Sequence, residues 1–302
     1  MHFTAITMET LIARFLHTPR FYLIYPIILA SGLTLRFISP HGLYTWLQHS
    51  YWVSSKNFIN QIFAHNGNTV FLILFIAVLV LRLADAPSNH QSRVSLTKQY
   101  TVKLGIKQFG LWALFYIIDH IFLATGGSCA VTKDFTSVLA QGITSFEECF
   151  KVNGTWVRLN EGFCSLTPDQ FSGKITAAQV CYKFGKWEGG FDISGHYCFL
   201  VTLSLILWNE LKGLQAGHEA QDLEAQTKSV PEKAWTKIST LNVLRWVLLL
   251  TILIWMNMLF VTAMFYHSVS EKLFGLVFGF VTPSFMYLLI PYFPIMEKYA
   301  YL

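Results

Sequence analysis

The sequence predicts an all-α membrane protein with about six transmembrane helices and both termini in the cytosol. Apolar residues make up 53% of its 302 residues and charged residues 13%, whereas a soluble domain carries about 25% charged residues. The apolar residues occur in continuous blocks rather than in the stripes of amphipathic helices. The net charge of +5 includes no basic tract, so nucleic acid is excluded as an expected partner.

The blocks are long enough to cross a bilayer, because a helix of about 20 mostly apolar residues spans the hydrocarbon core. The second block is unbroken from Phe71 to Leu81, and Pro26 is expected to kink the first. Within a single polytopic domain, 1–302, the predicted spans cover residues 21–38, 69–83, 104–124, 197–214, 243–266 and 273–293. Between the first two spans, the aromatic segment 41–64 is predicted to be an interfacial helix or half of a tight helical hairpin.

Lysine and arginine residues set the orientation of the predicted bundle. They gather before the first span, between the second and third spans, and in loop 215–242 with its flanks. These three segments are therefore expected in the cytosol. The long loop 125–192 is then expected in the lumen.

The predicted lumenal loop contains four of the five cysteines and the only glycosylation sequon, at Asn153. An even number of cysteines in one loop suits a compartment that permits disulfides, and a sequon is used only in the lumen. The alternative is free thiols and a chance sequon. Possible disulfides lie among Cys129, Cys149, Cys164 and Cys181, with the pairing open, whereas Cys198 is expected to be an ordinary core thiol.

Two histidines, each four residues from a carboxylate, lie at the predicted lumenal face. His196 follows Asp192 at the start of the fourth span, and His267 precedes Glu271 between the fifth and sixth. If both members lie in a helix, this spacing puts them on one face. One imidazole can attack phosphorus while a carboxylate fixes its tautomer, and the other can protonate the leaving oxygen. Ser194 and the backbone amides at the helix start are candidates for holding phosphate oxygens.

Other interpretations stay open at this point. Histidines at a membrane boundary are often ordinary polar interface residues, as expected of His41, His49 and His65. A metal site also competes, but no His-Glu-x-x-His spacing occurs, so neither a metal nor a cofactor is expected. Asp119 and His120 are expected at the lumenal water line, the alternative being an ion path in a small transporter.

The motifs around the histidines resemble those of known proteins. Ser194-Gly195-His196, with His267 and Glu271 as second histidine and acid, is similar to the type 2 phosphatidic acid phosphatase superfamily. A closer resemblance is to the fat storage-inducing transmembrane (FIT) family, in its loops more to a fungal than to an animal member. It rests on Asp192-Ile-Ser-Gly-His196, on Tyr266-His267 followed by Glu271-Lys272-Leu273 and Gly275, on Thr125-Gly-Gly-Ser-Cys129, and on the six-span layout.

This resemblance implies a multi-pass enzyme of the endoplasmic reticulum membrane that hydrolyses fatty acyl-CoA at its diphosphate, with the active site facing the lumen. The implied products are acyl-4'-phosphopantetheine and adenosine 3',5'-bisphosphate, and the implied roles are lipid droplet formation and phospholipid homeostasis. By the superfamily's pattern, His267 would be the nucleophile oriented by Glu271, and His196 the general acid supported by Asp192. The family also implies binding of diacylglycerol and triacylglycerol, and the alternative function is a non-catalytic protein that partitions this neutral lipid into droplets.

The sequence departs from the superfamily in its phosphate-binding residues. It has no Lys-x6-Arg-Pro clamp, and no Ser-Arg pair at the expected distance before His267. Lys186 and Lys272 are the candidates for the missing positive charge. A single lysine holds phosphate oxygens more weakly than the fork of an arginine.

Overall fold

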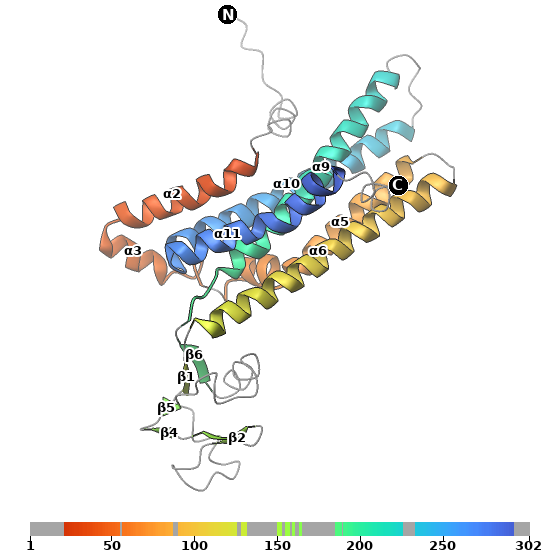
Figure 1. Cartoon of the computed structure of the whole chain (residues 1–302). Coiled ribbons are helices and arrows are strands. Elements are labelled where there is room, and N and C mark those ends of the chain that lie inside the picture. Colours follow the sequence, from red (N-terminus) through yellow and green to blue (C-terminus); the bar gives the residue numbers. More distant parts are fainter. Residues whose placement is uncertain are drawn as a thin grey trace, which may run out of the picture. The chain divides into compact units, whose positions relative to one another are not determined.

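The chain is a helical membrane protein, as the sequence predicts (Figure 1). The computed structural model describes residues 21–54, 56–86, 90–125, 128–131, 150–152, 155–157, 159–160, 163–164, 185–188, 190–225 and 233–292. Five of the described helical segments are long and apolar enough to cross a membrane, and each overlaps a predicted span. They are Phe21–Ile38, Gly67–Asp85, Gly195–Leu214, Leu241–Phe265 and Val269–Leu289.

The chain folds into two compact units, of which the first runs up to Leu111 and resumes at His196. Its elements are η1 (Phe21–Leu23), α2 (Ile24–Ile38), α3 (His41–Gln48), α4 (Phe58–Asn60), η2 (Gln61–His65), α5 (Gly67–Asp85), the first part of α6 (His90–Ala124), all but the first residue of α9 (Gly195–Ala225), α10 (Lys233–Phe265), α11 (Val269–Ser284), η4 (Phe285–Leu289) and η5 (Ile290–Tyr292). Helices α9 and α10 extend into the predicted loop 215–242, since α9 ends at Ala225 and α10 begins at Lys233.

The second unit runs from Trp112 to Gly195. Its described residues form the rest of α6 and six short strands that pair antiparallel in twos: β1 (Ser128–Val131) with β6 (Gly185–Glu188), β2 (Phe150–Val152) with β3 (Thr155–Val157), and β4 (Leu159–Asn160) with β5 (Phe163–Cys164). The sequon residue Asn153 and the cysteines Cys149 and Cys181 lie outside the described residues. The side chains of Cys129, Cys164 and Lys186 also lie outside the description.

Helix α9 forms the centre of the first unit, in which α9, α10 and α11 lie side by side (Figure 1). Its side chains Leu200, Leu207 and Trp208 are all fully buried. Helix α11 approaches it closely at Gly279, where an added Cβ would lie 2.7 Å from the Cβ of Val201. Small residues permit such contacts between membrane helices, where packing rather than water exclusion drives association.

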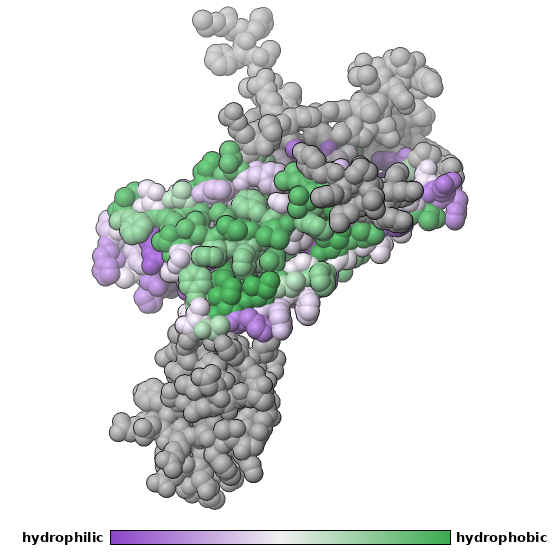
Figure 2. Space-filling model, viewed as in Figure 1, coloured by the Kyte–Doolittle hydropathy of each residue, from purple (hydrophilic) through white to green (hydrophobic). Residues whose placement is uncertain are grey.

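The surface of this unit carries many large apolar side chains, which Figure 2 shows gathered over the helices with hydrophilic residues toward the edges. On α10, for example, Leu250 is 60% exposed and Leu253 is 55% exposed. In water such a surface would favour aggregation, whereas lipid chains solvate it.

The predicted third span, 104–124, lies within the 35 residues of α6. This helix is not among the apolar segments identified in the described part of the chain. Two of its three lysines face neighbouring helices, since Lys103 donates a hydrogen bond to Glu210 of α9 and Lys107 donates one to Asn68 of α5. Glu210 is 1% exposed and also accepts hydrogen bonds from the hydroxyls of Tyr100 at 2.6 Å and Tyr287 at 2.7 Å.

The aromatic segment 41–64 is only partly a surface helix. Helix α3 exposes Trp46, which is 70% accessible. The rest of the segment is held against α10, because the indole of Trp255 donates to the carbonyl of Phe63 at 2.7 Å. In addition, the hydroxyl of Tyr266 donates to the carbonyl of Val53. These hydrogen bonds bring residues 52–60 beside the end of α10 that leads into the candidate site.

Candidate active site

His267 lies in the short turn between α10 and α11. Its φ angle is 55°, the only positive value among the non-glycine residues that the structure describes. This left-handed conformation costs an L-residue roughly 1–2 kcal/mol, and such strain gathers at functional positions. The guanidinium of Arg36, in the last turn of α2, donates from Nη1 to the His267 carbonyl oxygen at 3.3 Å. The turn that carries His267 is therefore braced by a helix 231 positions away in the chain.

Glu271 both starts α11 and faces His267. The backbone N–H of Ser268 donates to Glu271 Oε2 at 2.7 Å, and the Ser268 hydroxyl accepts from the Glu271 N–H at 3.4 Å, which completes a capping box. The same Oε2 lies 3.9 Å from Nδ1 of His267. The carboxylate thus stands where it can stabilise positive charge on the imidazole, and it leaves Nε2, at the other edge of the ring, away from this contact.

His196 lies in the first turn of α9 and is close enough to His267 for the two rings to interact electrostatically. Its Nε2 is 3.4 Å from Oδ1 of Asn60, at the end of α4. The amide oxygen can accept from this nitrogen in the tautomer of His196 that carries its proton on Nε2. His196 and His267, predicted to lie at the same face, are thus brought together within one unit by the packing of α9 against α10 and α11.

Asp192 and Ser194 belong to the second unit, where the backbone N–H of Phe191 donates to the Thr125 hydroxyl at 2.6 Å. Residues 191–194 are not helical, and α9 begins at Gly195. The helical spacing expected to align Asp192 with His196 therefore does not form. Ser194 is buried, and its hydroxyl has no hydrogen-bond partner among the described residues.

The positively charged side chain that contacts the turn of His267 is Arg36, which the sequence did not single out. Lys272, a candidate from the sequence, is fully buried and donates from Nζ to the Ala263 carbonyl oxygen at 2.6 Å. It therefore caps the last carbonyl groups of α10. Arg36 is half-buried, and its bond to His267 is its one side-chain hydrogen bond among the described residues. Four of the five N–H donors of its guanidinium are thus available to a ligand.

Arg36 and Asn60 are the two site residues that the sequence did not single out. An arginine in the last turn of an apolar span was a usable signal for Arg36, because charged residues within spans commonly serve function. Asn60 follows the N-cap Asn57 in a polar run without a recognisable motif. Only the folded chain shows that it reaches His196.

The remaining polar candidates show exposure or local contacts within their own units. Among the described residues, no group of three or more His, Cys, Asp or Glu side chains is placed to hold a metal ion. In the second unit, Asp119 is exposed, and Nδ1 of His120 contacts the carbonyl oxygen of Tyr116 at 2.8 Å. His49 makes a similar local contact with Thr45 at 2.7 Å.

A comparison with known protein families shows to which family this chain belongs. A sequence profile described as "Fat storage-inducing transmembrane protein" matches residues 48–287. The chain belongs to the fat storage-inducing transmembrane family. The FIT family resemblance of the motifs is thereby confirmed, and the matched region includes His196, His267 and Glu271.

Relatives of this FIT protein carry names that state an activity. An acyl-coenzyme A diphosphatase of Saccharomyces cerevisiae is 27% identical over 93% of this chain and 96% of that protein. Another of Sus scrofa is 31% identical over 70% of this chain and 78% of that protein. A third, of Schizosaccharomyces pombe, is 25% identical over 84% of this chain and 80% of that protein. No solved structure matches this FIT protein.

Proposed function

We propose that this FIT protein is a fatty acyl-CoA diphosphatase of the endoplasmic reticulum membrane with its active site facing the lumen. It hydrolyses the phosphoric anhydride of acyl-CoA to acyl-4'-phosphopantetheine and adenosine 3',5'-bisphosphate. The observation that carries the proposal is the geometry of His267, whose Nδ1 lies 3.9 Å from Oε2 of Glu271 in a left-handed turn, with His196 in the same unit and within electrostatic reach. The names of the relatives support acyl-CoA as the substrate. The cysteines and sequon of loop 125–192 support the lumenal orientation.

His267 is the proposed nucleophile and His196 the proposed general acid. Nε2 of His267 attacks one phosphorus of the diphosphate, the bond from that phosphorus to the bridging oxygen breaks, and a phosphohistidine forms. His196 gives its Nε2 proton to the departing oxygen, while Glu271 stabilises the positive charge on the His267 ring. Water then attacks the phosphohistidine and gives a proton to His196, which releases the second phosphate product and restores both histidines.

Arg36 supplies the positive charge for the phosphoryl oxygens in this proposal. Its guanidinium is anchored at the backbone of His267, and in this proposal its other N–H groups bind the phosphoryl oxygens of the phosphorus that His267 attacks. A planar arginine fork binds phosphoryl oxygens with charge-assisted hydrogen bonds, which strengthen as negative charge builds in the transition state. The roles of Ser194 in phosphate binding and of Asp192 in supporting His196 stay predictions that rest on the motif.

The experiment that tests the proposal is hydrolysis of oleoyl-CoA by the purified full-length protein beside His196→Ala and His267→Ala. Each variant is expected to lose hydrolysis while keeping its thermal unfolding midpoint. The matched control is His41→Ala, because His41 is an exposed histidine on α3 and lies outside the site. Full hydrolysis by both site variants would overturn the proposal.

The same variants separate the diphosphatase from the alternative function. A non-catalytic protein that binds diacylglycerol and triacylglycerol and partitions them into droplets would support droplet formation equally well without either histidine. Under the proposed function, droplet formation and phospholipid homeostasis depend on acyl-CoA cleavage. Cells that carry only His196→Ala or His267→Ala are therefore expected to fail in both.

A further inference from the structure

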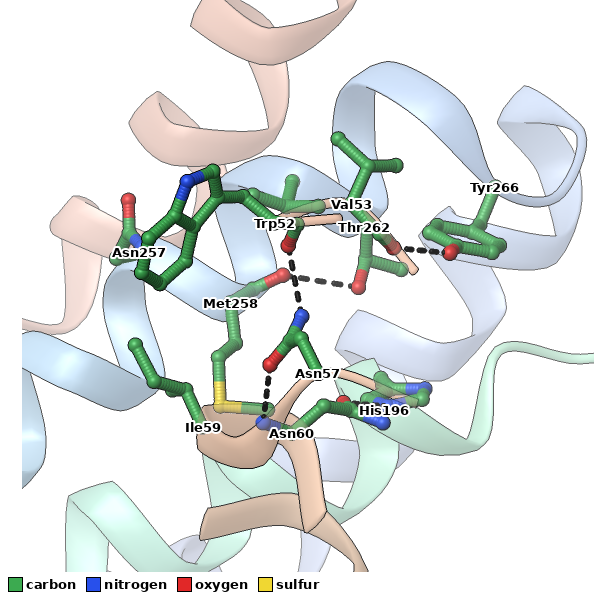
Figure 3. Close-up of a pocket in the computed structure, with 11 residues that line it drawn as sticks. Trp52, Val53, Asn57, Ile59, Asn60, His196, Asn257, Met258, Thr262 and Tyr266 are labelled. Atoms are coloured by element: carbon green, nitrogen blue, oxygen red, sulfur yellow. Dashed lines mark hydrogen bonds between the residues drawn. The ribbon is translucent and has the colours of Figure 1, made fainter. Parts of the chain in front are cut away.

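A cavity of about 320 Å³ opens between residues 52–60 and one face of α10 (Figure 3). The residues of α10 that line it are Asn257, Met258, Val261 and Thr262, and they are joined by Tyr266, which directly follows the helix and whose N–H still donates to the Thr262 carbonyl. Their spacing of one, three or four positions places them on a single stripe of the helix. At a rise of about 1.5 Å per residue, the stripe from the first to the last is about 13 Å long.

One end of this cavity is the candidate active site. His196 lines the cavity, and Tyr266 directly precedes His267 in the chain. In Figure 3, Asn257 and Tyr266 lie at opposite ends of the lining, with Met258 and Thr262 between them. The cavity therefore leads from the two histidines along α10, toward the interior of the apolar segment Leu241–Phe265.

The lining is mostly apolar and carries one available amide. Asn257 lies inside the apolar segment of α10 with an exposed side chain, and that side chain has no hydrogen-bond partner among the described residues. A carboxamide at membrane depth costs free energy unless a partner satisfies it. Asn57 differs, because its Nδ2 already donates to the carbonyls of Trp52 and Ser54 at 2.7 and 2.8 Å. Asn57 shapes the wall, and Asn257 offers a donor and an acceptor to a ligand.

The lack of positive charge in the lining favours the uncharged acyl-pantetheine half of the substrate over the phosphate-bearing adenosine half. Of the described residues, neither a lysine nor an arginine lines the cavity, so it is a poor place for the phosphates of the adenosine half. The pantetheine arm, in contrast, is uncharged and consists of short methylene segments joined by two amides, and it ends in the acyl thioester. The cavity volume is near the lower limit of small-molecule pockets, about 300–1,000 Å³, which suits one half of the substrate better than the whole.

We propose that this cavity is the acyl-pantetheine subsite, a step that rests on the proposed diphosphatase function. The diphosphate lies at His196 and His267, and the pantetheine arm runs from there along α10. The carboxamide of Asn257 hydrogen-bonds an amide of the arm. The adenosine bisphosphate half stays outside the cavity, on the aqueous side of the histidines.

The test compares two inhibitors, each of which represents one half of the substrate. S-octanoyl-pantetheine carries the arm and thioester without phosphate, and adenosine 3',5'-bisphosphate carries the other half. Val261→Trp puts an indole into the lining of the cavity. It is expected to abolish inhibition by S-octanoyl-pantetheine and to raise the KM for oleoyl-CoA at least about tenfold, while inhibition by adenosine 3',5'-bisphosphate is unchanged.

Asn257→Leu keeps the size of the side chain and removes its amide. Loss of one hydrogen bond is expected to weaken inhibition by S-octanoyl-pantetheine about three- to tenfold. The matched control for bulk is Leu250→Trp, at an exposed position of α10 outside the cavity. This control is expected to behave as the wild type with both inhibitors.

Unchanged S-octanoyl-pantetheine inhibition in folded Val261→Trp would overturn the subsite. The subsite also fails if diacylglycerol binding, and not this inhibition, is lost in Val261→Trp, because the cavity would then hold neutral lipid. Either result leaves the diphosphatase proposal intact as long as His196→Ala and His267→Ala abolish hydrolysis. If those histidine variants keep full hydrolysis, the failure lies in the proposed function itself.

Discussion

Replacing Arg36 with glutamine removes the cation that the structure places at the backbone of His267. The substitution leaves an amide donor on a shorter side chain in place of Nη1, which lies 3.3 Å from the carbonyl oxygen in the native protein. The charge and the fork of the guanidinium are removed. The proposed mechanism assigns both to the phosphoryl oxygens, so the loss is expected in catalysis rather than in folding.

The expected magnitude follows from the number of hydrogen bonds that the substitution removes. A hydrogen bond to a charged group contributes about 1.5–3 kcal/mol, and about 1.4 kcal/mol corresponds to a tenfold change in rate. If the glutamine retains the bond to the backbone and one hydrogen bond to a phosphoryl oxygen disappears, kcat/KM for oleoyl-CoA falls about ten- to a hundredfold. Arg36→Lys restores the charge without the fork and is expected to recover part of this loss. The assay is the steady-state hydrolysis of oleoyl-CoA by purified variants, with the thermal unfolding midpoint measured on the same samples.

The matched control is Arg93→Gln, the same chemical change at an exposed position of α6. It is expected to leave kcat/KM within about twofold of the wild type, since a substitution outside the site leaves transition-state stabilisation intact. If Arg36→Gln is equally active and equally stable, Arg36 does not contact the phosphate. If Arg36→Gln is inactive only because it is unfolded, and Arg36→Lys fails to recover activity in folded protein, the charge argument is also refuted.

Three further predictions concern other parts of the chain. Glu271→Gln is expected to lower kcat about ten- to a hundredfold, because it removes the charge beside Nδ1 of His267. The unfolding midpoint should change little, since glutamine also completes a capping box. Normal turnover would exclude the carboxylate from the mechanism. Glu210→Ala leaves the charge of the buried Lys103 without its carboxylate partner, and it is expected to lower the free energy of unfolding, measured in mixed micelles, by about 3–5 kcal/mol. The double variant Glu210→Ala/Lys103→Met is expected to recover part of this loss. Asn153→Gln is expected to abolish a glycosidase-sensitive gel shift of the protein in microsomes, and absence of any such shift in the wild type would count against use of the sequon.

Part of the candidate site could be predicted because it is local. His267 and Glu271 are four residues apart, and the Ser268 cap that starts α11 is a pattern of neighbouring residues. Their relation in the folded protein follows from this cap, because Glu271 closes the capping box with Ser268 and His267 directly precedes that box, although His267 itself is not helical. The prediction for Asp192 used the same spacing, but the helix begins only at Gly195, and a spacing argument holds only where the helix exists.

The cation and the cavity could not be predicted in this way. Arg36 reaches His267 across 231 positions, and Asn60 reaches His196 across 136. These contacts depend on which face of α2 packs against α10 and on how residues 52–60 pack beside the end of α10. Neither hydropathy nor short motifs encode those choices.

The sequence by itself determined that this chain is a helical membrane protein, because apolar blocks of bilayer length leave the backbone no other way to satisfy its hydrogen bonds. The sequence also identified His196 and His267 as candidate catalytic residues, because of their motifs and their positions at the ends of spans. Only the tertiary structure shows that Arg36 lies at the backbone of His267, whereas Lys272 donates to a carbonyl at the end of α10. It also decided that a cavity with an unsatisfied carboxamide leads away from His196. Both depend on close packing between distant segments, which places a side chain against a partner or leaves it exposed to a ligand.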